Sequence, residues 1–416
     1  MKKLFKNKNF VKFFFVEGLE QLGDSFLLMS LIAWVMTMKE NGSSSANMSL
    51  LMFWIGLPIV LFGPFAGVIV DRYKKKKVLV FSALSISACI FLIFLFTGKT
   101  SASFVFLLIF IKSLLSQIFI PARSSLIPHL VDERELLDAN SFSASFIIIV
   151  QMITYAFSGI VISEIGYKIC FLIDFFIYIL VIVILLFIKE NETVVAKKPI
   201  NLNEFKNEFI TGLKFLFSSE KILFVVRRVF ILLIALGFIY VSIMGSFLSS
   251  VLNATGLKMQ EIKALGFIQG FLGIGLALGV LIVKYVLKFF KEEEVIRSLY
   301  PIIGIFIASL YFWRNFYYLI AISILGGIAG IMILSIAETE IQKNTNPEVR
   351  GRIFSVYYIL RGAGLAAATS LTGLVAKVIR EDQIILICGI VLFVYGLIAF
   401  FAKRGSKIGR DKNPAA

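Results

Sequence analysis

The sequence predicts an all-α polytopic membrane protein with twelve transmembrane helices in two six-helix bundles and both termini in the cytoplasm. Hydrophobic residues make up 59% of the 416 residues and charged residues only 16%, whereas soluble domains are roughly 45–50% apolar and about 25% charged. The mean hydropathy is +0.91, and a soluble chain has too little interior to bury so much apolar surface. The placement of the basic residues, considered below, predicts the orientation.

Twelve apolar runs are long enough to cross a bilayer, which takes about 20 residues. The first six runs are 10–38, 47–70, 78–97, 103–121, 139–163 and 168–188. The other six are 223–252, 263–287, 295–313, 316–338, 352–376 and 383–402. The first run is too long for the apolar part of a signal peptide and lacks a small-residue cleavage site. We therefore expect it to remain as a spanning helix.

The Lys and Arg residues collect in alternate connections between these runs. With the termini and alternate loops assigned to the cytoplasm, 32 of the 42 basic residues lie inside and 8 outside, while Lys112 and Arg361 fall within helices. Cytoplasmic loops carry such an excess, and the Lys-, Ile-, Phe- and Asn-rich composition suits a bacterial cell membrane. Because the charge follows the loops instead of one helix face, the net charge of +16 does not indicate a nucleic-acid partner.

The longest polar connection, 189–222, divides the chain into an N-terminal bundle (1–188) and a C-terminal bundle (223–416). Within it, 203–217 has apolar residues at helical spacing, so it is either an amphipathic helix on the inner leaflet or a simple tether. Shifting the sequence by 212 positions places Gly67 on Gly279 and Phe142 on Phe354. Each pair occupies the same place in its half, which predicts two repeats of six helices.

Several function classes are excluded by what the sequence lacks. One histidine and three cysteines scattered in apolar runs provide no metal or disulfide pattern. We find no nucleophile elbow for a membrane enzyme and no phosphate-binding loop for an ATP-driven pump, so we expect no enzyme and no cofactor. The longest polar segment is too short for the soluble domain of a sensor. The remaining class is a secondary transporter, driven by an ion gradient.

Charged residues inside the apolar runs are the candidate functional groups, because each costs roughly 2.5–3.5 kcal/mol to insert. Glu17, Glu20 and Asp24 are spaced to share one face of the first helix. A carboxylate among them that binds a proton near neutral pH could carry it across the membrane. Alternatively, Glu17 and Glu20 lie solvated near the inner interface, paired with Lys12 or other lysines. Asp24, deeper in the helix, is the better proton-site candidate.

Three further charges lie within the apolar runs. Lys112 is at the middle of the fourth run and could pair with Asp24 or Glu20, either to switch the charge of a cavity or to hold two helices together. Arg361 lies among small residues and faces either the cavity or the cytoplasm. We expect Asp174, near the outer end of the sixth run, to be solvated and structural.

A glycine-rich stretch runs through the eighth apolar segment. Its members are Gly266, Gly270, Gly273, Gly275 and Gly279. Small residues at such spacing allow helices to approach closely in membranes. The run is apolar and lacks a following Lys-Ser, so it does not indicate a phosphate site.

The basic turn GVIVDRYKKKKVL at 67–79 resembles the loop between helices 2 and 3 of the major facilitator superfamily, G-x-x-x-D-R-x-G-R-K-x-x-L. Gly67, Asp71, Arg72, Lys75 and Lys76 fit the pattern, while Lys74 takes the place of a glycine. The resemblance implies a conformational latch. In it, Asp71 would cap the eleventh helix just after Arg350, Gly351 and Arg352, and release as the halves move.

Three segments resemble the macrolide-efflux-like branch of that superfamily. They are IPARSSLIPHLVDERELLDANSFSASF at 120–146, LGDSF around Asp24, and PEVRGRIFSVYY after the tenth run. The resemblance implies a twelve-helix drug:proton antiporter that exports small amphipathic substrates such as macrolides and uses the proton gradient without a cofactor. We expect protons and membrane lipids as its other partners and a monomer as its working unit. The antiporter motif of the fifth helix is absent. An exporter or flippase of lipid- or siderophore-like molecules is the alternative.

Overall fold

In a computed structural model the described residues are 4–38, 44–70, 72–189, 210, 213–214, 216–217, 219–345 and 347–410. The first half of the chain forms long helices joined by short turns. These are α1 (Lys8–Met36), α2 (Ser44–Val70), α3 (Lys75–Phe96), α4 (Ala102–Leu126), α5 (Leu136–Ile165) and α6 (Tyr167–Leu186). Most of the predicted linker at 189–222, including its proposed amphipathic helix, lies outside the described residues.

The second half repeats the pattern with one interrupted helix at its start. Its helices are α8 (Glu220–Ser242), η4 (Ile243–Phe247), α9 (Leu248–Thr255), α10 (Glu261–Phe289), α11 (Glu292–Ser309), α12 (Phe316–Lys343), α13 (Pro347–Val375) and α14 (Glu381–Arg410). Together α8, η4 and α9 occupy the predicted run 223–252, which was expected to be one continuous helix. The break is at Gly245, whose φ of −77° and ψ of −140° are not helical.

Eleven helices in the described part of the chain are long and apolar enough to span a membrane, and each matches a predicted run. The predicted run 295–313 corresponds to α11, which is not among the eleven. Its 18 residues include three glutamates in the first turn, although it packs between α12 and α14 like a spanning helix. The prediction of an all-helical, multi-span membrane protein is confirmed. The orientation of the termini stays a prediction.

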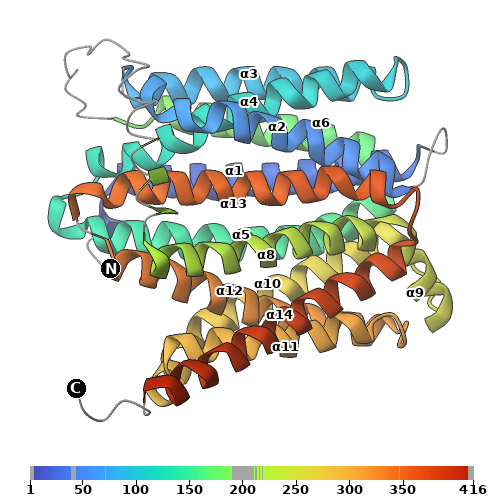
Figure 1. Cartoon of the computed structure of the whole chain (residues 1–416). Helices are drawn as coiled ribbons and strands as arrows, with labels where there is room; N and C mark the ends of the chain where they lie inside the picture. The colour runs from blue at the N-terminus through green and yellow to red at the C-terminus, as the bar shows by residue number, and fades with distance from the viewer. Residues whose placement is uncertain are drawn as a thin grey trace.

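The helices pack as two groups, α1–α6 and α8–α14, with the start of α1 and the end of α14 at the same end of the molecule (Figure 1). We call that end the terminal end and the opposite one the far end. In the first group α1 packs on α5 and α6, and α2 on α4. In the second group α8 packs on α13 and α14, and α10 on α12. These are equivalent contacts, as expected for the repeat with an offset of 212.

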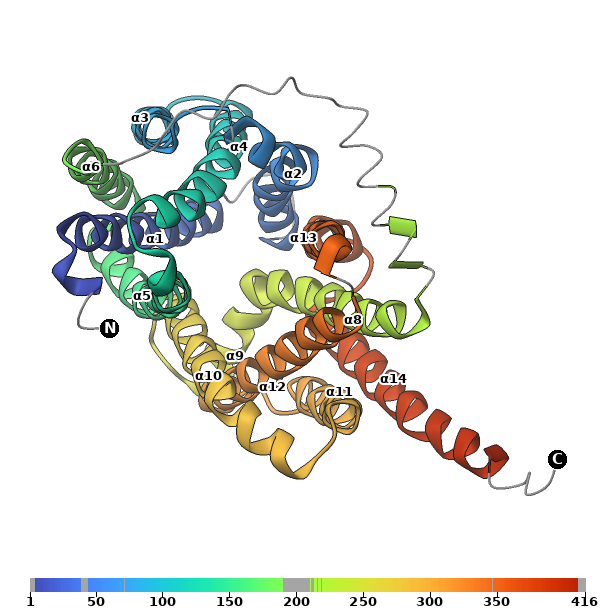
Figure 2. The same ribbon diagram turned by 90° about the vertical axis from the view of Figure 1, so that its left-hand side faces the viewer.

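Two helix pairs, α5 with α10 and α2 with α13, join the groups (Figure 2). Glycines let the α5 and α10 backbones touch: a Cβ added at Gly266 would lie 2.8 Å from the carbonyl oxygen of Tyr155 and 3.0 Å from the Cα of Gly159. The other face of α10 packs on α12 in the same way, through Gly275 and Gly279. The glycine-rich stretch therefore packs closely on both sides, as predicted.

Polar contacts close the far end of the joint between the groups. Ser45, near the start of α2, donates a 2.8 Å hydrogen bond to the Oε1 of Glu381 at the start of α14. The backbone N–H of Gly373 donates to the Oγ of Ser49 at 2.6 Å, and Gln260 donates to the carbonyl of Ser163 at 3.2 Å. These bonds between described residues of the two groups lie near helix ends far from the termini. The structure therefore has the groups joined at the far end.

Candidate functional site

An ion pair between α1 and α4 lies at mid-depth in the first group. The Lys112 Nζ is 2.6 Å from the Asp24 Oδ1, and the two side chains are 11% and 27% exposed. The hydroxyl of Tyr178, on α6, donates to the same oxygen at 2.7 Å. An isolated lysine in an apolar helix would cost several kcal/mol in a bilayer, and the charge-assisted bond to the carboxylate offsets part of that cost. Of the two partners that the sequence allowed for Lys112, the structure brings Asp24 to it.

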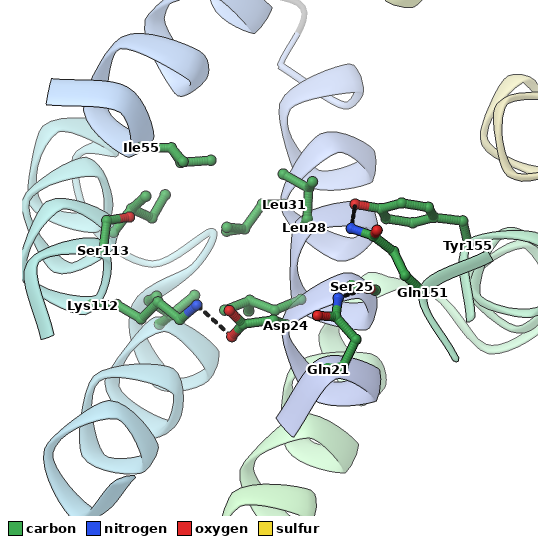
Figure 3. Close-up of a pocket in the computed structure, with 13 residues that line it drawn as sticks. Gln21, Asp24, Ser25, Leu28, Leu31, Ile55, Lys112, Ser113, Gln151 and Tyr155 are labelled. Atoms are coloured by element: carbon green, nitrogen blue, oxygen red, sulfur yellow. Dashed lines mark hydrogen bonds and ion pairs between the residues drawn. The ribbon is translucent and has the colours of Figure 1, made fainter. Parts of the chain in front are cut away.

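The ion pair borders a cavity of about 280 Å³ between α1, α2, α3, α4 and α5 (Figure 3). One wall is polar: Gln21 donates to Ser25 at 3.0 Å, and Gln151 donates to the hydroxyl of Tyr155 at 3.3 Å. The aliphatic part of the lining comprises Leu27, Leu28, Leu31, Ile55, Ile93 and Ile109. Ligand pockets have volumes of about 300–1,000 Å³. The cavity therefore suits a small molecule, or one part of a larger amphipathic one.

Glu17 and Glu20 form a second cluster with Arg123, one to two turns closer to the terminal end. Arg123 donates to Glu20, and its Nε is 3.8 Å from the Oε1 of Glu17. The two glutamates are only 2% and 4% exposed, so the alternative that they are solvated at the interface is wrong. Lys12, the partner considered there, instead donates to the carbonyl of Phe187 at 2.9 Å.

Sequence reasoning missed Arg123 as a buried group. The predicted fourth run stopped at residue 121, which left Arg123 among the basic residues of the following cytoplasmic loop. In the structure α4 continues past Pro121 to Leu126, which carries the arginine into the bundle. The spacing of eleven residues, or about three turns, from Lys112 to Arg123 was the available signal, since it places both cations on one face of a single helix.

Asp174, on α6, also differs from the sequence prediction. It was expected to be solvated near the outer end of its helix, but it is fully buried against α1. The reason is that α6 packs on both α1 and α3, so depth along the helix does not reveal which face a residue occupies. With Asp174, the first group holds four buried or half-buried carboxyl groups around two cations.

A polar contact extends from this region to the second group. On α10, Gln269 is 7% exposed, donates to the hydroxyl of Tyr240 on α8 at 3.0 Å, and lies 3.8 Å from the sulfur of Met29 on α1. It is the one polar side chain between Gly266 and Gly273, a signal that the sequence offered and that was not used. Gln269 and Tyr240 are therefore polar residues of the second group that face α1 and α5 of the first group.

Arg361, the other predicted cavity charge, lies elsewhere. Its Nη1 donates to the Oε1 of Glu338 on α12 at 3.1 Å, and both side chains are about one-third exposed. It is not among the residues that line the cavity beside Lys112. The pair lies wholly within the second group.

The predicted latch is described only in part. Gly67 lies in the last turn of α2, and Arg72 lies in the turn before α3. Lys75 donates to the carbonyl of Val70 at 3.0 Å, and Lys76 donates to the carbonyl of Ile188 at 2.6 Å, so both lysines bind their own half.

The partners proposed for that latch remain untested. Asp71 is outside the described residues. Arg350, Gly351 and Arg352 are helical at the start of α13, but their side chains are likewise outside. The cap on α13 stays a prediction. Within the described ranges no group of three His, Cys, Asp or Glu residues is arranged to hold a metal ion.

Comparison with known proteins gives one family over nearly the whole chain. A family model described as transmembrane secretion effector matches residues 5–414. The MFS-type transporter YfiS of Bacillus subtilis is 22% identical over an alignment of 419 positions, which covers 97% of this chain and 95% of its own. Macrolide efflux protein A of Streptococcus pyogenes is 30% identical over 136 residues, 32% of each chain. The staphyloferrin A transporter of Staphylococcus aureus is 21% identical over 363 residues, 86% of this chain and 87% of its own.

Solved structures of transporters share the fold. The nucleoside transporter NupG superposes with a TM-score of 0.71 at 16% identity, covering 94% of this chain and 98% of its own. An auto-inhibited peptide transporter of the POT family superposes with a TM-score of 0.73 at 11% identity, covering 98% of both chains. At these identities the likeness shows the fold alone.

Proposed function

We propose a proton-coupled export function on the premise that the chain belongs to the transmembrane secretion effector family of major facilitator transporters. Its substrates would be small amphipathic compounds such as macrolides, exported from a bacterial cell membrane by alternating access. The observation that supports this proposal is the Lys112–Asp24 ion pair at the edge of a cavity with one polar and one aliphatic wall. The residues that line this cavity all come from one chain, which supports a monomer as the proposed working unit.

The coupling follows from the chemistry of the pair. When Asp24 is ionised, its carboxylate neutralises the Lys112 ammonium. A proton on Asp24 removes that partner and leaves a positive charge on the cavity wall. A cationic or neutral amphipathic substrate would then be repelled or left unanchored, whereas it is favoured when Asp24 is ionised. Proton and substrate thus compete for one site, which is the requirement for exchanging them across a membrane.

Glu20 and Glu17 are the second choice for the proton site. They are bound to Arg123 and more deeply buried than Asp24. Asp24, with a side chain that is 27% exposed, borders the cavity directly, so a proton reaches it without crossing packed side chains. We therefore assign the exchangeable proton to Asp24.

The test uses everted membrane vesicles that hold a respiration-imposed pH gradient. Erythromycin or ethidium should partly collapse the gradient with the wild type and with Asp138→Asn, a matched change at an exposed aspartate of α5. Asp24→Asn should abolish the response. A response that persists in Asp24→Asn would transfer the proton to Glu20 or Glu17, and no response to any compound in the wild type would refute drug antiport.

A siderophore-like substrate is the second candidate. It is supported by the staphyloferrin A transporter, which matches a far larger share of the chain than macrolide efflux protein A does. A substrate rich in carboxylates would bind Lys112 itself and would be favoured when Asp24 is protonated, the reverse of the dependence expected for a drug. A lipid-like substrate instead fits the apolar cavity of about 350 Å³ between α8, α13 and α14. Running the vesicle assay with a carboxylate siderophore and with a labelled lipid separates the three.

A further inference from the structure

Asp174 is a buried carboxyl group that the function proposed above does not use. It lies on α6, one turn from Tyr178, and its exposed fraction is 0%. Neither carboxyl oxygen has a hydrogen-bond partner among the residues that the structure describes. Across from it, α1 has a glycine at Gly23, and a Cβ there would collide with the Asp174 Oδ1. The carboxyl group therefore fills a space that α1 leaves open one residue before Asp24.

An ionised carboxylate in this position would be very costly. Removing an ion from water costs several kcal/mol even after relaxation, and that cost is offset only by close partners and hydrogen bonds. Asp174 has neither within the described part of the chain, because Lys112 and Tyr178 both bind Asp24 instead. A neutral carboxylic acid costs much less to bury. The geometry thus fits an Asp174 that holds a proton.

The neighbouring charges place Asp174 in the same electrostatic unit as the ion pair. Asp174 lies against Gly23, next to Asp24 in α1, and Tyr178, one turn along α6 from Asp174, donates to the Asp24 Oδ1. The charged and titratable groups of this region on the packed helices are Asp24, Glu17 and Glu20 of α1, Cys89 of α3, Lys112 and Arg123 of α4, Tyr155 of α5 and Tyr178 of α6. Arg123 donates to Glu20, so Lys112 is the cation that serves the two aspartates.

We propose that Asp24 and Asp174 share one proton and that Lys112 pairs with whichever of them is ionised. In this structure the proton is on Asp174 and Lys112 binds Asp24. In the exchanged state the O–H bond of Asp174 breaks, an O–H bond forms on Asp24, and the Lys112 Nζ moves to the Asp174 carboxylate. Lysine has a flexible four-carbon stem, and the charge of the three groups together is unchanged.

This inference rests on the proposed proton coupling and refines it. A proton that reaches the cavity while both aspartates are ionised would bind Asp24 and pass inward to Asp174, and Lys112 would keep Asp24 as its partner. We call Asp24 the port, because it borders the cavity, and Asp174 the store, because it retains this proton. The proton that a substrate displaces is a further one, bound to Asp24 while the store is filled. Asp174→Asn would imitate a store that is permanently filled, so drug binding and the proton release assigned to Asp24 would both persist.

The direct test is infrared spectroscopy on the full chain in lipid vesicles, with aspartate labelled by ¹³C at the side-chain carboxyl. The label separates aspartic acids from Glu17 and Glu20, and a protonated carboxyl has its own C=O band. At neutral pH the wild type should show a labelled acid band that Asp174→Asn abolishes. Asp24→Asn should abolish it as well, because Asp174 must then ionise to pair with Lys112. Lys112→Met should add a second acid, since neither aspartate retains a cation.

Each result decides the proposal without reference to transport. A band unchanged in Asp174→Asn would show that this residue is ionised and would overturn the inference. A band lost in Asp174→Asn but retained in Asp24→Asn would show a buried acid that does not share its proton, which also overturns it. Asp138→Asn should leave the band unchanged. If the infrared bands change in the variants as expected while the vesicles show no proton exchange with any compound, the proposed export function is refuted and the shared proton is supported.

Discussion

The contact between α5 and α10 predicts that a single methyl group can open the far end. In Gly266→Ala the new Cβ would lie 2.8 Å from the carbonyl oxygen of Tyr155 and 3.0 Å from the Cα of Gly159. Both neighbours are backbone atoms that no rotamer change can move. Favourable carbon contacts are about 3.5–4.0 Å, so the two helices must separate by about 0.5–1 Å.

The expected magnitude follows from the cost of overpacking, which is typically about 1–3 kcal/mol. The contact joins the two helix groups at the far end. The overpacking therefore raises the free energy of the state in which the far end is closed, and it is relieved when the groups separate there. A difference of about 1–3 kcal/mol changes the ratio of the two states by about 5- to 150-fold. Gly266→Ala should therefore shift the population toward an open far end by that factor.

Pulsed electron paramagnetic resonance measures the shift. Spin labels at Lys168→Cys and Lys258→Cys are at exposed positions of the far end, one in each group, and the native cysteines are buried. The matched control is Gly326→Ala in α12, where an added Cβ meets nothing within 4 Å. A distance distribution for Gly266→Ala that equals the control's would refute the role given to this contact.

Two more predictions concern the buried arginine and the orientation. Arg123→Met should lower the free energy of unfolding by about 3–5 kcal/mol, because two buried carboxylates lose their cation; adding Glu20→Gln should restore part of it, and thermal unfolding in detergent measures both. In right-side-out vesicles an impermeant maleimide should label a Lys99→Cys variant and leave Lys77→Cys unlabelled, both positions being exposed. The reverse pattern would overturn the predicted cytoplasmic termini.

The spans could be predicted because a bilayer imposes length and composition at once. A segment that is apolar for about 20 residues is long enough to cross the bilayer. The helices start and end within about five residues of the predicted runs, except α14, which continues to Arg410 where the run was ended at 402. The glycines of α10 were also informative, since close helix packing in lipid depends on small residues. Only α11, with its charged first turn, falls short of the apolar composition that defines the other spans.

The site was only partly predictable, because residue spacing shows which face of a helix a side chain occupies but not which neighbouring helix that face contacts. Glu17, Glu20 and Asp24 could be placed on one face of α1, yet which cation each would meet depended on how α4 lies against it. Arg123 was missed because the fourth run was ended at residue 121, and Asp174 was missed because its position near a helix end was taken to mean that it is exposed. The break at Gly245 left no local signal, because isolated glycines are common in membrane helices.

The location of the charges bears on how the transporter would work. The buried carboxyl groups and their cations lie on three helices: Glu17, Glu20 and Asp24 on α1, Lys112 and Arg123 on α4, and Asp174 on α6. These helices belong to one group, so none of the ion pairs among these residues has to break when the two groups move. What would change is the position of the second group, whose Gln269 lies 3.8 Å from the sulfur of Met29 in the first group, relative to the cavity. Asp24 borders that cavity and Asp174 does not. Movement of the groups would therefore expose the port to one side or the other while the stored proton stays sealed, and leakage requires Asp24 to be accessible from both sides at once.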